Sequence, residues 1–376
     1  MRIQNINKIE VPVNLSKKYI KKVIESSPAG MNQTFYLEGP SGIGKSEIVA
    51  QLAKELNAEL FDIRLGSLDV IDLNGIGIPD IENKKAIWTR PENFPPENSN
   101  KNFILFLDEF NHANEAVMGA AYQLVLERRM GVHKFPKNML IIAAGNSIDD
   151  KGIAFTMPSP LQNRFMKIHV IPEIESFLEY ADSKSISWKI KGYLKANPDD
   201  LHKFDPKIDE SNFPTPRNWF KLNEIIESFD DDKLYSQVIL NSLFGMKIQI
   251  KFLTYLELIG KFPKVEDILN GKKNKLKLVT DIGSSYAFYM LIKNYFINNI
   301  NNISHTQFIN LIKFAEKQDN QEIMQMMILE LISYVNKNLN KEELKKLHLQ
   351  FFQNEKLILN NKNFKEEMKK FHSSMK

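Results

Sequence analysis

A glycine-rich octapeptide constrains this chain more than any other feature. It reads Gly39-Pro40-Ser41-Gly42-Ile43-Gly44-Lys45-Ser46, follows the apolar run 35–37 and precedes a helical pattern over 47–56. Glycines at this spacing let backbone N–H groups turn toward a phosphate, and the positive end of a following helix favours the same charge. The lysine can reach terminal phosphate oxygens, and the serine hydroxyl can bind Mg²⁺. The octapeptide therefore predicts a nucleoside triphosphate site, and the alternative is a chance glycine-rich turn between a strand and a helix.

A second apolar run ends in two acidic residues. Residues 103–107 read Phe-Ile-Leu-Phe-Leu, which is typical of a strand buried on both faces, and Asp108 and Glu109 follow. In phosphate-loop NTPases an acid at this strand end holds Mg²⁺, and a neighbouring carboxylate can polarise the attacking water. We predict Asp108 as the metal partner and Glu109 as the catalytic base. Alone, the pattern also suits an ordinary strand end, but its place roughly 60 residues after the glycine-rich loop favours the functional interpretation.

Composition narrows the class of protein. With 376 residues, 43% of them hydrophobic, the chain can bury a full core and form two or three domains. The absence of cysteine excludes disulfides, zinc–thiolate sites and thiol catalysis. Residues 1–11 contain no apolar signal core, and no run approaches the ~18 apolar residues of a membrane span, so we expect a cytoplasmic protein without a membrane partner. A net charge of +4 does not by itself indicate a nucleic-acid binder.

The order of apolar patterns predicts the fold. Strand-like runs at 34–37, 60–64, 102–107, 139–144 and 166–171 alternate with helical segments, which predicts an α/β core with a parallel sheet. From Glu173 onward the patterns are helical, with breaks near Pro263 and over 271–275. We predict a nucleotide-binding core over 1–171, an α-helical lid domain over 172–262 and a C-terminal helical extension over 263–376.

Three further polar residues follow or precede predicted elements. Asn146 ends the apolar run 139–144, where its amide could contact the γ-phosphate or the attacking water. Arg164 precedes the last predicted strand, and Arg217 opens a predicted helix. Each also has an ordinary interpretation, because asparagine is common in strand-ending turns and a lone arginine is usually a surface charge.

Five segments in order resemble the motifs of AAA+ ATPases, and within them the MoxR-like ATPases of the helix-2-insert group. They are GPSGIGKS for Walker A, ILFLDE for Walker B, IIAAGN for sensor 1, SPLQNRF for the arginine finger and FPTPRNW for sensor 2. Residues 65–95 are similar to the insert of this group, and residues 127–136 to the hairpin before sensor 1. Beyond Lys264 the similarity rests on helical character alone.

The resemblance implies a role for each motif residue. ATP and Mg²⁺ would be the cofactors, Arg164 would reach the γ-phosphate of a neighbouring subunit, and Arg217 would contact the nucleotide of its own subunit. It also implies a homo-oligomer, usually a hexamer, and a protein client that in many members carries a von Willebrand A domain and is remodelled as by a chaperone. The implied nucleotide-binding residues are Gly39, Pro40, Ser41, Gly42, Ile43, Gly44, Lys45, Ser46 and Glu47. The implied metal-binding residues are Ser46 and Asp108, and the implied catalytic residues are Glu109, Asn146, Arg164 and Arg217.

One position departs from the family pattern. The family often reads DE-[IL]-N-R-A after Walker B, whereas this chain has His112 in place of the arginine. We expect weakened or retuned hydrolysis, with Arg128 or Arg129 as a compensating residue. The other interpretation makes His112 a polar residue of a first helical turn.

Two other functions are compatible with the same motifs. One is a nucleic-acid motor of a restriction or defence system, with the lysine-rich tail 341–376 as its contact surface; glutamates interrupt that tail, so nucleic acid is possible but not favoured. The other is a nucleotide-gated switch with negligible turnover. The intact Glu109 argues against a switch, because a switch has no need for a catalytic base.

Overall fold

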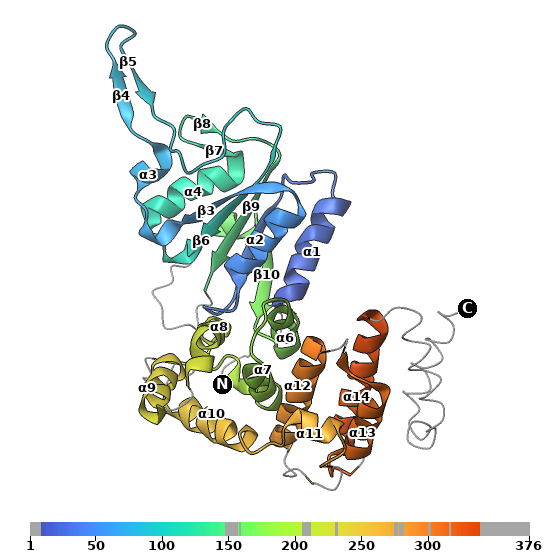
Figure 1. Cartoon of the computed structure of the whole chain (residues 1–376). Coiled ribbons are helices and arrows are strands. Elements are labelled where there is room, and N and C mark those ends of the chain that lie inside the picture. The colour runs from blue at the N-terminus through green and yellow to red at the C-terminus, as the bar shows by residue number, and fades with distance from the viewer. Residues whose placement is uncertain are drawn as a thin grey trace, which may run out of the picture. The chain divides into compact units, whose positions relative to one another are not determined.

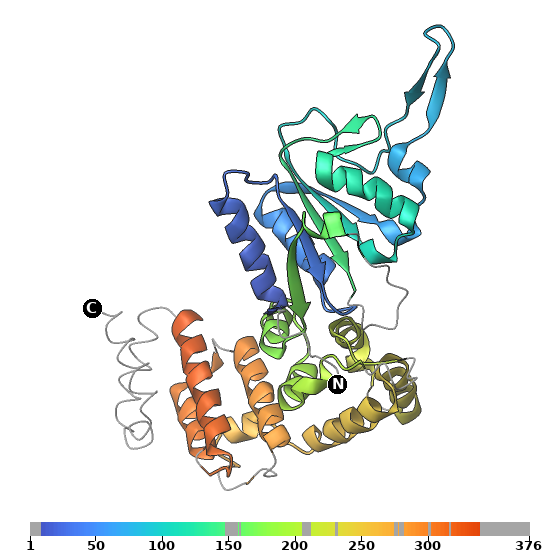
Figure 2. The same cartoon turned by 180° about the vertical axis from the view of Figure 1, so that it is seen from behind.

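The computed structural model describes residues 9–146, 157, 159–204, 212–229, 232–273, 277, 282–299, 302–315 and 317–338 (Figures 1 and 2). The chain forms two compact units. The first contains residues 1–184, 201–225 and 242–245, and the second contains 185–200, 226–241 and 246–376. The division into three domains at residues 171 and 262 stays a prediction, and the lysine-rich tail 341–376 lies outside the described residues.

A parallel sheet organises the first unit. In the described residues its six strands lie in the order β1-β10-β2-β9-β6-β3. Their bounds are β1 (Glu10–Pro12), β10 (Met166–Ile171), β2 (Thr34–Glu38), β9 (Met139–Gly145), β6 (Asn102–Asp108) and β3 (Ala58–Arg64). All neighbours pair in parallel. The α/β core with a parallel sheet and the helical region that follows it are thus confirmed.

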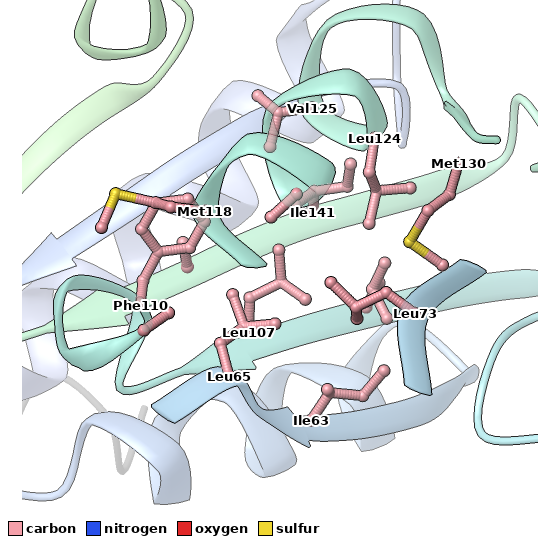
Figure 3. Packing of buried hydrophobic residues seen from close by; sticks show 14 of the residues in the cluster. Ile63, Leu65, Leu73, Leu107, Phe110, Met118, Leu124, Val125, Met130 and Ile141 are labelled. Atoms are coloured by element: carbon pink, nitrogen blue, oxygen red, sulfur yellow. The ribbon is translucent and has the colours of Figure 1, made fainter. Parts of the chain in front are cut away.

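Side chains of β6 point alternately to the two faces of the sheet. Both faces are buried, which explains why the central strands read as continuous apolar runs. Leu105 belongs to a core on one face of the sheet, with residues of α4 (Glu115–Glu127), while Phe106 belongs to a core on the other face, with residues of α1 (Val13–Ser26) and α2 (Lys45–Glu55). Figure 3 shows Leu107, Ile141 and Leu124 meeting in the first of these cores. Each fully buried side chain of this size contributes about 1.5–3 kcal/mol, so this double burial fixes the sheet.

The chain between β3 and β6 forms an insert that leaves the core. It contains the short helices η1 (Leu65–Ser67) and α3 (Val70–Asn74) and the antiparallel strands β4 (Gly77–Asp80) and β5 (Lys85–Trp88). Leu73 packs in the core beside Met130, which anchors the base of the insert (Figure 3). The β4–β5 hairpin projects away from the sheet in both views, with Ile78 and Ile87 about half exposed, at 53% and 54% (Figures 1 and 2).

Short elements complete the first unit. These are η2 (Phe110–His112), β7 (Arg129–Met130), β8 (His133–Lys134), α5 (Ser159–Gln162), α6 (Ile174–Ser183) and α8 (Pro216–Ile225). Strands β7 and β8 pair in antiparallel, so the hairpin expected over 127–136 is present. Thr215 caps α8, since its side-chain oxygen accepts a hydrogen bond from Asn218 N at 3.2 Å.

Helices make up the described part of the second unit. They are α7 (Trp188–Ala196), η3 (Pro198–Asp200), η4 (Ile226–Ser228), α9 (Lys233–Phe244), whose last residues belong to the first unit, α10 (Met246–Ile259), α11 (Val265–Leu269), α12 (Ile282–Asn299), α13 (His305–Ala315) and α14 (Gln321–Asn338). The buried carboxylate of Asp200 accepts hydrogen bonds from Tyr193 Oη at 2.7 Å and Lys251 Nζ at 2.9 Å, which satisfies its charge. None of the described helices combines the length and the apolar character that a membrane crossing requires.

Candidate nucleotide-binding site

The glycine-rich loop lies at the carboxyl edge of the sheet, between β2 and α2. Gly42 and Gly44 have left-handed backbones, with φ of +76° and +104°, a conformation that side-chain-bearing residues rarely adopt. A Cβ at Gly39 would lie 2.2 Å from the carbonyl oxygen of Val170 on β10, so a larger residue would clash there. The backbone conformation and packing of this loop thus require glycine at positions 39, 42 and 44, where the sequence has it.

Lys45 joins this loop to the neighbouring strand end. Its buried Nζ donates hydrogen bonds to the carbonyl oxygens of Gly39 at 2.7 Å and Pro40 at 2.8 Å, and to Asn146 Oδ1 at 3.3 Å. The contact between residues 45 and 146 forms because β2 and β9 are adjacent and parallel, so their carboxyl ends meet. The structure therefore brings the predicted phosphate-binding lysine and the predicted sensor asparagine together.

Ser46 and Asp108 form a second contact between loop and strand end. The hydroxyl of Ser46 donates to Asp108 Oδ2 at 3.0 Å, and Asp108 Oδ1 accepts from the backbone N–H of Glu109 at 2.9 Å. A hydroxyl and a carboxylate oxygen are ligands that suit Mg²⁺. Among the described residues no three His, Cys, Asp or Glu side chains gather as a metal site. Mg²⁺ at nucleotide sites commonly takes one or two protein ligands and completes its coordination with phosphate oxygens and water.

Glu109 has a strained backbone at the end of β6. Its φ is +53°, in the left-handed region that is uncommon for residues other than glycine. The turn points an exposed carboxylate toward η1, where a Cβ on Gly66 would lie only 3.2 Å from Glu109 Oε2. Glycine at position 66 thus leaves room for the predicted base, a contact that the sequence did not indicate.

A returning segment of the first unit, residues 201–217, touches the same loop. The backbone N–H of Arg217 donates to the carbonyl oxygen of Gly42 at 3.1 Å, and a Cβ on Gly42 would lie 3.1 Å from Thr215 Cβ. The backbone of Arg217, the predicted sensor-2 arginine, therefore contacts the glycine-rich loop of its own chain. Its side chain is exposed.

His202, in the same segment, lies beside this loop and was missed at the sequence level. Burial lowers its pKa, a hydrogen bond to the Ser41 backbone opposes the shift, and the positive charge of Lys45 adds to the lowering. The Nε2 atom of the ring is buried without a hydrogen-bond partner. The only sequence signal was its nearness to the Pro-Thr-Pro-Arg motif.

Arg164 lies at the opposite edge of the sheet. It precedes the amino end of β10, where Met166 is paired with Phe35, whereas the phosphate loop begins after Glu38 at the carboxyl end. Six residues of parallel strand correspond to about 20 Å, so the exposed side chain of Arg164 does not reach the loop of its own chain. The structure does not bring Arg164 into this site.

Glu47 follows Ser46, but its side chain turns to α6. It accepts hydrogen bonds from Tyr180 Oη at 2.6 Å and Gln51 Nε2 at 3.3 Å, and Lys184 Nζ lies 4.0 Å away. Burial favours a higher pKa for Glu47, but these two hydrogen bonds and the charges of Lys184 and Lys54 outweigh it and lower the pKa. The carboxylate of Glu47 therefore interacts with side chains of α6 and α2 and not with the phosphate loop.

The Arg128 side chain, one of two expected to compensate for His112, is engaged within its own chain, and the compensation stays a prediction. The Arg128 guanidinium donates to the carbonyl oxygens of Met139 at 2.5 Å and Gln33 at 3.0 Å, which lie at the amino ends of β9 and β2. Its burial lowers the pKa to about 10. Arg128 therefore stabilises the edge of the sheet that lies away from the phosphate loop. Arg129 is exposed and lies 3.5 Å from the carboxylate of Glu127.

A comparison with known protein families indicates which kind of nucleotide-binding domain this site resembles. Residues 34–165, from β2 to the residue after Arg164, match the AAA domain of the dynein-related subfamily. Over these residues the chain is thus similar to AAA ATPase domains. The match covers the phosphate loop, Asp108, Glu109 and Asn146, and it implies binding and hydrolysis of ATP. No curated protein matches the sequence.

Solved structures give weaker likenesses, over 70–85% of this chain. The RuvB Holliday junction branch migration motor of Thermotoga maritima is 17% identical over 70% of this chain and 76% of its own, with a TM-score of 0.37. A Cytophaga hutchinsonii protein described as an ATPase is 15% identical over 83% of this chain and 80% of its own, with a TM-score of 0.35. NtrX of Brucella abortus is 15% identical over 85% and 69%, with a TM-score of 0.36.

Proposed function

We propose that this protein is a MoxR-like AAA+ ATPase that hydrolyses ATP with Mg²⁺ in a hexameric ring and thereby remodels, loads or activates a protein client with a von Willebrand A domain. One observation carries the enzymatic part of the proposal. Two consecutive residues of the phosphate loop, Lys45 and Ser46, contact the sensor residue Asn146 and the Walker B residue Asp108 across two different strands. Such convergence of motifs from distant parts of the sequence is what ATP hydrolysis requires.

The chemistry follows from these contacts. Lys45 and the loop N–H groups would hold the phosphates, and Mg²⁺ held at Ser46 and Asp108 would neutralise developing charge. Glu109 would accept a proton from water as the water oxygen attacks the γ-phosphorus, while the bond to the bridging oxygen of ADP breaks. Asn146 would orient that water. The products are ADP and inorganic phosphate.

The position of Arg164 supports a ring. An arginine that stabilises the transferring phosphoryl group must reach the γ-phosphate, and Arg164 lies at the sheet edge away from its own loop. A neighbouring copy would instead present its phosphate loop to this edge. Arg217, whose backbone contacts Gly42, would serve the nucleotide of its own chain.

The exposed hairpin supports a protein client over a nucleic acid. Its three isoleucines and its tryptophan are exposed: Ile78 53%, Ile81 86%, Ile87 54% and Trp88 44%. Exposed apolar groups of this kind mark protein contacts, whereas nucleic-acid surfaces depend on clustered Lys and Arg. In the hairpin Lys84 and Lys85 are balanced by Asp80 and Glu82.

The test is steady-state ATP hydrolysis by the purified protein. It is measured with and without Mg²⁺, with a purified von Willebrand A domain protein, and with single-stranded and duplex DNA. We expect Mg²⁺-dependent hydrolysis that the protein client changes and DNA does not. Stimulation by DNA that falls steeply with salt would instead establish the nucleic-acid motor.

A further inference from the structure

We infer that Asn111 is a positioning residue for hydrolysis, which acts by holding Asn146 at the end of β9. The inference rests on the proposed ATPase function, and it assigns a role to a residue that the motifs leave without one. Asn111 lies in η2, two residues after the proposed base Glu109.

The side-chain amide of Asn111 binds both backbone groups of one residue. Its Nδ2 donates to the carbonyl oxygen of Asn146 at 2.8 Å, and its Oδ1 accepts from the backbone N–H of Asn146 at 3.1 Å. The donation to a carbonyl fixes which way the amide faces. Asn111 is only 5% exposed, so water does not readily replace these bonds.

These two bonds replace strand pairing where the sheet ends. The last pair between β6 and β9 joins Leu107 to Ala143, and the last pair between β2 and β9 joins Glu38 to Gly145. Asn146 comes after both ladders. Its backbone is therefore held by the side chain of Asn111, as a neighbouring strand would hold it.

Close packing prevents the amide of Asn111 from shifting. A Cβ on Gly145 would lie 2.6 Å from Asn111 Oδ1 and 2.0 Å from the hydroxyl oxygen of Tyr36. Glycine at position 145 is thus required for this approach. The arrangement leaves the amide little room to give up either bond.

The consequence concerns the orientation of the sensor. Lys45 binds the side chain of Asn146, and Asn111 binds its backbone, so both ends of the sensor residue are fixed. The turn that carries Asn111 also carries Glu109, so base and sensor are set by one short segment. ATP binding depends instead on the loop 39–46. Loss of Asn111 should therefore slow turnover and spare ATP affinity.

The experiment is a double-mutant cycle on kcat and on ATP affinity, with the full-length protein. The variants are Asn111→Ala, Asn146→Ala and the pair. Asn111→Asp is a second variant of nearly the same shape, which keeps the acceptor for Asn146 N–H and loses the donor to Asn146 O. The control is Asn114→Ala, which removes the N-terminal cap of α4, where Asn114 Oδ1 accepts from Val117 N at 2.9 Å.

We expect Asn111→Ala and Asn111→Asp to lower kcat on the order of 10²-fold, as for a misplaced catalytic group, with the Kd of ATP within about twofold of the wild type. When Asn146 is already alanine, adding Asn111→Ala should lower kcat little further, because the side chain that Asn111 positions is no longer present. Asn114→Ala should lower the Tm while leaving kcat near wild type.

Multiplicative losses in the double variant would overturn the inference, since they would mean that Asn111 does not act through Asn146. A kcat loss that merely tracks the fall in Tm across Asn111→Ala, Asn111→Asp and Asn114→Ala would overturn it as well. A wild-type protein that binds ATP but never hydrolyses it would refute the proposed function itself, and the inference with it.

Discussion

Replacing Gly66 with alanine should slow ATP hydrolysis without weakening ATP binding. The added Cβ would lie 3.2 Å from Glu109 Oε2 and 3.3 Å from His112 Cβ, closer than ordinary van der Waals contact. Gly66 is not among the glycines with a left-handed backbone, so alanine fits the local conformation. The exposed carboxylate of Glu109 can yield by rotating, and we expect the folding free energy to change by less than about 1 kcal/mol.

The energy cost of rotating the Glu109 side chain determines how far kcat should fall. A side chain displaced about 30° from its rotamer stores about 0.5–1.5 kcal/mol. If the transition state needs the original orientation of Glu109, that energy adds to the barrier and lowers kcat roughly 2- to 12-fold. The Kd of ATP should stay unchanged, because the phosphate loop is untouched.

The assay is kcat from steady-state phosphate release, beside calorimetric ATP binding. Gly119→Ala on α4 is the matched control, because its Cβ would meet nothing within 4 Å. That change should stabilise the helix by about 0.5–1 kcal/mol and leave kcat alone. An unchanged kcat in Gly66→Ala, or an equal loss in both variants, would refute the placement of Glu109 as the base.

Three further outcomes follow from the site. Lys45→Ala should abolish ATP binding, because its buried ammonium supplies charge that water does not replace in a closed site; calorimetry with wild-type affinity would contradict this. Glu109→Gln should bind ATP and stall turnover, since shape is kept and the base is lost, and wild-type turnover would move the base elsewhere. His202, whose pKa in the free protein is lowered chiefly by burial, should take up a proton when ATP binds, because negative charge of the triphosphate beside Ser41 raises that pKa. Calorimetry should show this uptake as a binding enthalpy that depends on the buffer, and His202→Gln should lose that dependence.

The sequence predicted the parts of the fold that depend on local pattern. β9 is buried along its whole length, and a strand buried on both faces reads as a continuous apolar run. The phosphate loop was equally visible, because Gly42 and Gly44 meet a backbone requirement that few other residues satisfy. Once the sheet is parallel, the meeting of Lys45 with Asn146 follows from the adjacency of β2 and β9.

Contacts between side chains far apart in the sequence were not predictable. Asn111 meets Asn146 across 35 residues, and Gly66 meets Glu109 across a strand and a long insert, and neither pair has a spacing that marks it. Side-chain direction was also hidden. Glu47 turns to Tyr180 on α6, and Arg128 turns to the amino edge of the sheet, although both lie close in sequence to motifs.

The central claim is that each ATP site is completed by Arg164 of a neighbouring copy, and subunit mixing tests it most directly. Arg164→Ala should retain ATP binding and lose turnover on the order of 10³-fold, and Lys45→Ala should be inactive for lack of bound ATP. Because the two residues would belong to opposite sides of one interface, mixing the two inactive variants should create sites with an intact Arg164 beside an intact Lys45.

We predict that ATP hydrolysis reappears in the mixture and rises with protein concentration as copies assemble. A mixture that stays inactive while light scattering shows that the two variants co-assemble would contradict the account. Activity per chain that is independent of concentration down to the monomer would contradict it equally.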